Sequence, residues 1–290
     1  MVGRIATVTL LAATIAATLA GCSMLPTAAA PGGGGAGGAP AESARPPATV
    51  IGSMAPSSGS VAGGTRVTVR GTGLAAVRSV TIGGIAVRPT TSSATSVTVV
   101  TPAQAGFDQG TVPVVLRGSG AAALSKATFH YALTSGVDKQ LHYVLTYWKH
   151  YNPAWMPLDD NDCVDFTSQS LLARGWKPSA DWTPNKANIY HAGPAWRGSN
   201  EFRRYVLSHH LGHELTDEER SKVKLGDVVQ FDWNGNGDRD HTGVVTRITH
   251  TASGIRIFFA GHTIDSKYRN VDTAITKDHP GGKAWYLSLK

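Results

Sequence analysis

Glycine and tryptophan divide the chain into two parts that cannot share one kind of fold. Of the 33 glycines, 20 precede Gly136, whereas all 7 tryptophans lie between Trp148 and Trp285. At 290 residues, the chain has room for two ordinary domains. With 41% hydrophobic and 16% charged residues, it is neither a charged disordered chain nor a protein with many membrane spans. We therefore expect two unlike, folded domains.

The net charge of +7 is also distributed unevenly. Residues 22–135 carry 7 Lys and Arg against 2 Asp and Glu, and residues 136–290 carry 19 against 18. A nucleic-acid-binding face would gather basic residues on one surface, with aromatic side chains among them. Here the basic residues of the first part are scattered, so we interpret them as solubility charge and expect no nucleic-acid partner. They include Arg66, Arg70, Arg78, Arg88 and Arg117.

Residues 1–21 have the features of a secretory signal peptide. Arg4 precedes an apolar, alanine-rich stretch, which is short for a membrane span and ends in small residues. The signal closes with a sequence that resembles the lipobox of bacterial lipoproteins, Leu19-Ala20-Gly21-Cys22. This resemblance implies that Cys22 is lipidated and becomes the new N-terminus. The exported protein would then be anchored to the cell membrane by its lipid and face the cell wall or the periplasm.

Residues 22–49 consist almost wholly of Ala, Gly, Pro and Ser and cannot bury a hydrophobic core. We interpret them as a disordered, flexible tether that keeps the following domains close to the membrane. Lipidation of Cys22 would leave Cys163 as the only thiol of the exported protein. A disulfide framework is then impossible, and a lone thiol in an oxidising compartment calls for a functional explanation.

Short runs of β-branched or alternating apolar residues recur about every ten residues within positions 50–133. Glycine-rich turns separate them, and this spacing is typical of an antiparallel β-sandwich. The segment has no cysteine, one histidine and one carboxylate, so we expect no catalysis from it. The predicted strands are 66–70, 79–82, 96–100, 112–117 and 127–131.

The order of pieces in this domain resembles the IPT/TIG family of immunoglobulin-like domains. The resemblance implies an all-β, immunoglobulin-like sandwich that acts as a spacer or as a binding module, and we favour the spacer. It rests on Pro-Ser-Ser-Gly at 56–59, the run 63–71, Val-Thr-Ile-Gly-Gly at 80–84, the pair Thr101-Pro102 and the closing Phe129-His130-Tyr131.

A helix is predicted early in the second domain. Phe166, Ser170 and Leu171 are spaced so that they share one buried face of such a helix. Asn161 or Asp162 can serve as its N-cap.

Cys163 falls in the first turn of this predicted helix. There the helix dipole and the free backbone N–H groups stabilise a thiolate and lower the pKa of a cysteine. The same N–H groups can stabilise the oxyanion that forms when a thiolate attacks a carbonyl. We therefore predict that Cys163 is a nucleophile rather than a buried structural cysteine.

Three strands are predicted later in the second domain, over residues 225–231, 241–248 and 254–260. His241 opens the second of them, and His262 follows the third. A helix with Cys followed by antiparallel strands with His is the papain-type order. In this arrangement Cys163 attacks the substrate, His241 takes and returns the proton, and His262 orients His241. Asp265 is the alternative third polar residue if His262 contacts substrate instead.

Residues 162–169 read Asp-Cys-Val-Asp-Phe-Thr-Ser-Gln and are followed by Gly226-Asp227, His241-Thr242 and His262-Thr263. This series resembles the bacterial putative amidase domain family of papain-like (NlpC/CHAP-like) cysteine hydrolases. The family motif is close to Asp-Cys-Thr-Asn-Phe-Val-Ser-Gln, so five of its eight positions match. Among the matches, Asp162 and Gln169 would support the Cys helix. The departures are Val164, Asp165 and Thr167.

The resemblance implies an α+β papain-like domain over residues 137–290, without a cofactor. It also implies hydrolysis of amide bonds in peptidoglycan peptides, through a thioester on Cys163. Asp165 is the departure that matters, because a second carboxylate near the thiol opposes thiolate formation unless it caps the helix. Two alternatives stay open: a catalytically inactive wall-binding lipoprotein with the same fold, and an acyltransferase that uses the same residues.

Residues 232–240 match the first half of an EF-hand calcium loop. Gly243 stands where the closing glutamate belongs, so we favour a polar hairpin loop over a calcium site. His209 and His213 are four residues apart, but a zinc site is not expected because they lack the HExxH pattern and a nearby third ligand. The candidate calcium ligands are Asp232, Asn234, Asn236, Asp238 and Asp240.

Overall fold

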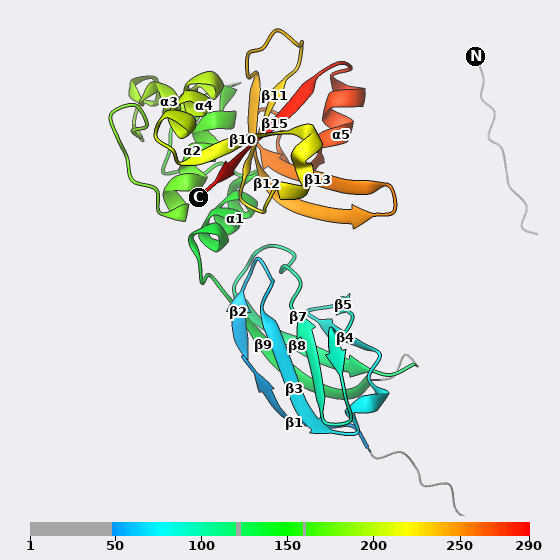
Figure 1. Cartoon of the computed structure of the whole chain (residues 1–290). Coiled ribbons are helices and arrows are strands. Elements are labelled where there is room, and N and C mark those ends of the chain that lie inside the picture. Colours follow the sequence, from blue (N-terminus) through cyan, green and yellow to red (C-terminus); the bar gives the residue numbers. More distant parts are fainter. Residues whose placement is uncertain (1–47, 120–122, 159–160) are drawn as a thin grey trace, which may run out of the picture. The chain divides into compact units, whose positions relative to one another are not determined.

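The computed structural model describes residues 48–119, 123–158 and 161–290. The predicted signal peptide, Cys22 and nearly all of the predicted tether lie outside these residues. Pro46–Lys290 form one compact unit, in which an all-β domain precedes a mixed α/β domain (Figure 1). This order agrees with the unequal distribution of glycine and tryptophan along the chain.

The first domain consists of two sheets. One sheet has the order β1 (Val50–Ala55), β3 (Arg66–Thr72), β7 (Ser96–Val100) and β6 (Thr91–Ser92). The other has the order β2 (Ser58–Ser60), β9 (Ala123–Ala132), β8 (Gly110–Arg117), β4 (Ser79–Ile82) and β5 (Ile85–Val87), with a 3-10 turn, η1 (Leu74–Ala76), before β4. The five predicted strands are confirmed as β3, β4, β7, β8 and β9. Strands β1, β2, β5 and β6 were not predicted, and β2, β5 and β6 have only two or three residues, which are too few for a period of two.

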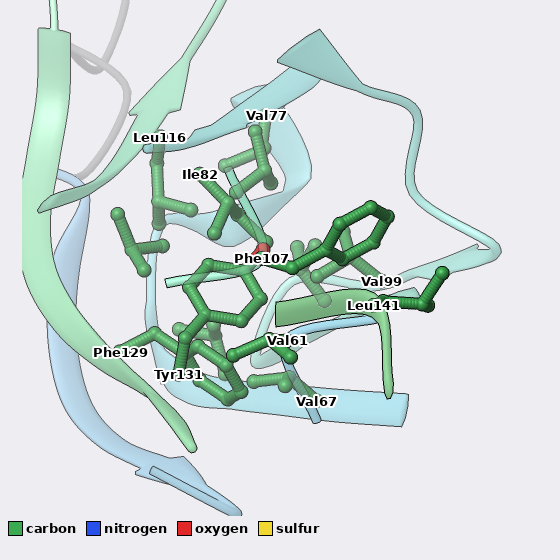
Figure 2. Packing of buried hydrophobic residues seen from close by; sticks show 14 of the residues in the cluster. Val61, Val67, Val77, Ile82, Val99, Phe107, Leu116, Phe129, Tyr131 and Leu141 are labelled. Carbon is green, nitrogen blue, oxygen red and sulfur yellow. The ribbon is translucent and has the colours of Figure 1, made fainter. Parts of the chain in front are cut away.

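Alternating side chains of the two sheets meet in the core of this sandwich. In β3, Val67 and Val69 are buried between more exposed neighbours, which is the period of two expected for a strand with one buried face. Phe129 and Tyr131 of β9 pack edge to face, with ring centroids 5.1 Å apart (Figure 2). The Tyr131 hydroxyl donates to the Pro102 carbonyl at 2.8 Å, so the buried phenol keeps a hydrogen bond.

The second domain combines helices with one six-stranded antiparallel sheet. The order of the sheet is β10 (Gly212–Thr216), β15 (Lys283–Leu289), β11 (Val228–Asp232), β12 (His241–Thr251), β13 (Gly254–Gly261) and β14 (Ser266–Asn270). The helices are α1 (Gly136–Tyr147), α2 (Cys163–Arg174), α3 (Pro194–Arg197), α4 (Ser199–Ser208) and α5 (Val271–Thr273). Short turns are η3 (Ile189–His191), η4 (Asp217–Lys222) and the π turn η5 (Ala274–Asp278). The predicted helix is confirmed as α2, and the predicted strands are confirmed as β11, β12 and β13.

Both faces of this sheet are covered at β11, because every residue of that strand is buried. Val228 contributes to a core with residues of α2, α3 and α4, whereas Val229 and Phe231 contribute to another core with residues of α5. Figure 1 shows α2, α3 and α4 on the side of the sheet away from α5. Consecutive residues of one strand therefore face different partners, and this decides the geometry of the candidate site.

Helix α2 has the largest buried share of the five helices described in the second domain. Its first nine residues are all buried, so burial is not confined to the single apolar face predicted from the sequence and includes polar side chains. Contacts with α1, α3 and β12 explain this burial. The helix ends at Gly175, which has a φ of 108° and donates its N–H to the carbonyls of Leu171 and Leu172.

The buried carboxylate of Asp138 fixes the start of α1. Its Oδ2 accepts the N–H groups of Thr134 and Ser135, both at 2.9 Å, and the Thr134 hydroxyl at 2.8 Å. Its Oδ1 accepts the Ser60 hydroxyl at 2.6 Å and the Ala62 N–H at 3.2 Å. Burial acts to raise the pKa of Asp138, but these hydrogen bonds outweigh it and hold the pKa below its usual value.

We expect Asp138→Ala to lower the free energy of unfolding by about 3 kcal/mol at pH 7, because it leaves several buried donors without an acceptor. The folded-state pKa lies below the unfolded value of about 3.9, so the carboxylate stabilises the fold above that value and this contribution is lost as pH falls. Urea unfolding at pH 7 and near pH 3 measures both effects. Asp108→Ala removes an exposed carboxylate and serves as the control. Equal losses in the two variants would contradict the assignment.

Candidate active site

Cys163 is the first residue of α2 and is 1% exposed. The backbone N–H groups of Thr242 and Val164 and the hydroxyl of Ser199 lie close to its sulfur, where they act to lower the pKa of Cys163. Burial nevertheless raises the pKa of Cys163 to about 11, and the nearby charge of Asp162 acts in the same direction. The thiol is therefore protonated at neutral pH in this structure.

The groups close to the sulfur belong to a buried polar network. Ser199 opens α4, and its hydroxyl lies 2.9 Å from the hydroxyl of Thr242 in β12. Gln230 of β11 donates its Nε2 to the Ser199 carbonyl at 2.9 Å and to the Thr242 hydroxyl at 3.1 Å. The Gln230 Oε1 is buried and has no hydrogen-bond partner within the described residues. This network fixes the donors of α4 and β12 against the first turn of α2.

No hydrogen bond or ring contact joins His241 to Cys163 among the described residues. His241 and Thr242 are consecutive in β12, so their side chains point to opposite faces of the sheet. The Thr242 side chain lies on the face covered by α2. The His241 ring lies on the other face, with its centroid 6.0 Å from that of Phe231 and 5.8 Å from that of Trp233. The predicted proton transfer between Cys163 and His241 has no contact to support it among the described residues.

His241 is also electrostatically unlike the partner of a thiolate. Burial, followed by the charges of Arg269 and His279, lowers the pKa of His241 to about 3. Its ring is therefore neutral at pH 7. With Cys163 protonated and His241 neutral, the two groups do not form an ion pair in this state.

His262 does lie on the α2 face, close to the start of that helix. Its Nδ1 is 2.5 Å from Oδ2 of Asp162, the residue before Cys163, and its Nε2 is 2.9 Å from the Tyr147 carbonyl oxygen. The structure therefore brings His262 to Asp162, while no hydrogen bond joins it to His241 in the part of the chain that the structure describes.

Two aromatic rings hold the imidazole of His262 between them. The Tyr151 ring lies parallel to it, with centroids 3.7 Å apart and 3° between the planes. The Phe166 ring of α2 also stacks on the imidazole, with centroids 3.7 Å apart and 17° between the planes. Asp265, the alternative third polar residue, accepts the Tyr151 hydroxyl at 3.0 Å and so reaches His262 only through Tyr151.

The carboxyl groups of α2 have roles that the sequence motif did not predict. Asp162 occupies the N-cap position, but its side chain does not cap the helix and instead accepts the Leu158 N–H at 2.9 Å. Asp165 is fully buried and accepts hydrogen bonds from the Trp196 indole and, at 2.6 Å, from Nε2 of Gln169. Burial, followed by the charge of Asp162, raises the pKa of Asp165 to about 8.

The loop of the candidate calcium ligands is closed by its own backbone. The Asp232 carboxylate accepts the N–H groups of Gly235, Asn236 and Gly237 at 2.6, 3.1 and 2.8 Å. Burial acts to raise the pKa of Asp232, but these hydrogen bonds hold it below its usual value. Within the described residues, no group of three or more His, Cys, Asp or Glu is arranged to hold a metal ion.

His209 and His213, the two histidines that are four residues apart, lie in different elements. Helix α4 ends at Ser208, His209 follows as its C-cap, and His213 lies in β10. They therefore do not share a helix face, as a pair four residues apart on one helix would.

Ser199 and Gln230 had no sequence signal, and Thr242 appeared only as the neighbour of His241. Ser199, Thr242 and Gln230 reach Cys163 or its donors only because α4 and the sheet fold against α2. The aromatic run before α2, which contains Tyr143, Tyr147 and Tyr151, could have indicated a buried aromatic surface, but not that one of its rings stacks on His262.

We expect Cys163 to react slowly with an alkylating reagent at pH 7–8 and faster as pH rises toward about 11, because burial disfavours its thiolate. A Cys22→Ser variant makes Cys163 the only thiol for this measurement. The same variant unfolded in urea should titrate near the unperturbed value of about 8.5. A folded thiol that titrates at or below that value would show that the site is open.

Comparison with solved structures gives remote likenesses. An auxiliary nutrient binding protein from Bacteroides thetaiotaomicron is 23% identical, with a TM-score of 0.23, and the match covers 29% of this chain and 21% of that protein. The Bacteroides ovatus protein SGBP-B, from a mixed-linkage glucan utilization locus, is 12% identical, with a TM-score of 0.23, over 80% of this chain and 50% of that one. At these TM-scores neither likeness carries an argument about fold or ligand. The comparison with curated proteins gives no match.

Comparison with family models covers both domains. The IPT/TIG domain model matches residues 49–131, which identifies the two-sheet sandwich as an immunoglobulin-like domain. The model described as "Putative amidase domain" matches residues 136–285, from α1 into β15, and supports an amide-bond hydrolase. Because this second match spans more than half of the 290 residues, the chain belongs to the Putative amidase domain family.

Proposed function

We propose that the second domain hydrolyses an amide bond with Cys163 as the nucleophile. The observation that carries this proposal is the convergence of three donors, from Thr242, Ser199 and Val164, on the sulfur at the N-terminus of α2. Donors in this position stabilise a thiolate, and a carbonyl oxygen drawn to the same place would gain the stabilisation of an oxyanion. The family match supports the reaction class, and the contacts support the choice of nucleophile.

The proposed reaction has two stages. In the first, the Cys163 sulfur loses its proton to a base and bonds to the amide carbon, the C–N bond breaks, and the amine leaves with that proton. In the second, water attacks the thioester, which releases the acid and returns the proton to the sulfur. An amine in place of water would give acyl transfer with the same residues.

Cys163 is not accessible to a substrate in the described structure, so the proposal includes a movement that exposes its sulfur when substrate binds. The thiol is buried and protonated, and a substrate carbonyl must reach the sulfur before the first stage. His241 is the proposed base, because it adjoins Thr242, whose N–H lies close to the sulfur. Because the backbone sets the face of a strand side chain, the start of β12 must rearrange to carry the His241 ring from the Phe231 face to the α2 face. The pair of His262 with Asp162 is the competing assignment, since a carboxylate already orients that imidazole.

The proposed substrate is a peptide of peptidoglycan, and the proposed location is the outer side of the cell membrane, with Cys22 lipidated. Support comes from the signal-like segment and the lipobox-like sequence that ends at Cys22. No helix within the described residues is long and apolar enough to cross a membrane. The IPT/TIG domain would act as a spacer between the tether and the hydrolase.

A second candidate function is binding of the cell wall without turnover. Two observations favour binding without turnover. The Cys163 thiol is buried with a raised pKa, and no contact joins it to His241, whereas a protein that only binds needs neither a thiolate nor a base. The two functions differ in whether the thiol is needed.

We expect Cys163→Ala to abolish release of new amino termini from purified peptidoglycan, with a loss of at least about a thousandfold relative to the unaltered protein. The variant should still bind the wall, because the substitution removes only the sulfur. Digestion followed by labelling of free amines measures turnover, and co-sedimentation measures binding. Unchanged digestion by Cys163→Ala would overturn the cysteine mechanism. Binding without digestion by either protein would establish the second candidate.

Separate His241→Ala and His262→Ala variants assign the base. Loss of digestion in His241→Ala, with wild-type unfolding temperature, supports His241. If only His262→Ala loses digestion at unchanged stability, the base is His262.

We expect the wild-type chain, expressed in a bacterium, to incorporate labelled fatty acid and to fractionate with membranes, and Cys22→Ala to do neither, because acyl chains on that thiol supply the anchor. Radiolabelling and fractionation measure both properties. Cys163→Ala serves as the matched control and should be labelled normally. Equal labelling of wild type and Cys22→Ala would contradict the lipid anchor.

A further inference from the structure

A buried glutamine joins the two hydroxyl groups at the Cys163 site. Gln230 of β11 is 1% exposed, and its Nε2 donates to the Ser199 carbonyl at 2.9 Å and to the Thr242 hydroxyl at 3.1 Å. The hydroxyl oxygens of Ser199 and Thr242 are 2.9 Å apart. A carbonyl oxygen only accepts hydrogen bonds, so the group of Gln230 that faces it must be the NH₂ group. The Ser199 carbonyl therefore fixes the direction in which the amide of Gln230 points.

The hydrogens that these groups can donate are set by their chemistry. An NH₂ group carries two hydrogens and each hydroxyl group carries one, so the three groups together hold four. The Oε1 of Gln230 has no hydrogen-bond partner within the described residues, so it accepts a hydrogen from neither hydroxyl group.

The contacts inside the network use three of these hydrogens. The contacts are those of Nε2 with the Ser199 carbonyl, of Nε2 with the Thr242 hydroxyl, and of the two hydroxyl groups with each other. Because Nε2 only donates, it supplies the hydrogen of the first two contacts. One hydroxyl hydrogen fills the third contact, whichever hydroxyl group is the donor there. The other hydroxyl hydrogen remains.

The remaining hydrogen has the Cys163 sulfur as its acceptor. The Ser199 hydroxyl lies close to that sulfur, and neither hydroxyl group makes a further hydrogen bond in the part of the chain that the structure describes. A buried hydroxyl hydrogen without an acceptor is costly, so the network favours a contact with the sulfur. A thiol is a weak acceptor and a thiolate a strong one, so this contact strengthens when Cys163 loses its proton.

We propose that Gln230 is a positioning residue that, by donating at both of its contacts, directs one hydroxyl hydrogen of Ser199 and Thr242 onto the Cys163 sulfur. An acceptor in its place would take the hydrogen of Thr242, the hydrogen of Ser199 would turn to Thr242, and the sulfur would receive none. Gln230 acts on the sulfur only through the two hydroxyl groups. Its importance for catalysis rests on the proposed function.

Gln230→Glu tests the direction of the hydrogens, because a glutamic acid side chain carries at most one hydrogen in place of two. At most three hydrogens then serve the three contacts, and none is left for the sulfur. The readout is the S–H stretching band of Cys163 in Raman spectra of the folded full chain with Cys22→Ser, in which Cys163 is the only thiol. We expect the band to shift to the same position in Gln230→Glu and in Ser199→Ala. It should stay in place in Thr242→Ser, which keeps the hydroxyl group.

Gln140→Glu is the matched control. It makes the same substitution at a buried glutamine of α1 whose Oε1 accepts a hydrogen bond from Arg174, outside this network, and it should leave the band unchanged. An unshifted band in folded Gln230→Glu would overturn the proposal. A further shift when Gln230→Glu is added to Ser199→Ala would also overturn it, because the effect would then not pass through the Ser199 hydroxyl.

Gln230→Met keeps the proposal testable if Gln230→Glu does not fold. Methionine removes both donated hydrogens, so either hydroxyl group can donate to the other. The remaining hydrogen then belongs to Ser199 in some molecules and to Thr242 in the others. We therefore expect two S–H bands, at the positions of the wild type and of Ser199→Ala. A single band at the wild-type position would show that Gln230 does not set the direction.

Digestion of peptidoglycan measures the consequence for catalysis. We expect Gln230→Glu to lower kcat about tenfold or more and to leave KM unchanged, because it removes a hydrogen bond to the charged sulfur and no contact with substrate. Gln140→Glu should keep the wild-type kcat. Equal kcat values of the wild type and Gln230→Glu would overturn the positioning role. Because the Raman spectra need no substrate, an inactive wild type would count against the proposed function, while the spectra still decide the direction of the hydrogens.

Discussion

The contact between Asp162 and His262 joins two parts of the second domain that are 100 residues apart in sequence. Asp162 precedes α2 and His262 follows β13, so this one pair fixes the N-terminus of the central helix against the end of a central strand. The stacking of Tyr151 and Phe166 on the imidazole excludes water from the pair. In such surroundings an unpaired charge is costly, so each member requires the other. The position of Cys163, one residue after Asp162, follows from this contact.

The same burial that fixes Cys163 also restrains its reactivity. Three donors surround the sulfur, and each favours the thiolate, yet the loss of solvent outweighs them and the pKa of Cys163 rises to about 11. A substrate that displaced the closed packing would bring its own dipoles and admit a base, while the donors of β12 and α4 stay in place. The donors that would stabilise the Cys163 thiolate therefore already lie near the sulfur, whereas the base that would remove the proton of the thiol is not in contact with it.

Much of the architecture could be predicted from the sequence. Five strands of the sandwich and three strands of the sheet appeared as runs of β-branched or alternating apolar residues, and the start of α2 lies at Asp162, one of the two predicted N-cap positions. Strands β1, β10, β14 and β15 and the shortest strands of the sandwich were not predicted. The position of Cys163 in the first turn of α2 was also predicted. The pairing of His241 with Cys163 was inferred from chain order and from the resemblance to the amidase family, and neither says which face of the sheet a side chain occupies. A shift of one residue in a strand reverses that face. His241 therefore lies beside Phe231, and Thr242 meets α2.

The sequence by itself determined the two unlike domains, the main strands, the helix with Cys163 at its start, and the residues that match the amidase motif. These depend on local spacing and on the types of neighbouring residues. Only the tertiary structure decided the partners of the titratable groups: that Thr242 and Ser199 lie close to the Cys163 sulfur, that Asp162 pairs with His262, and that Asp165 meets Trp196 and Gln169. The physical reason is that protonation depends on burial and on charges brought close by folding, and neither quantity is local in the sequence.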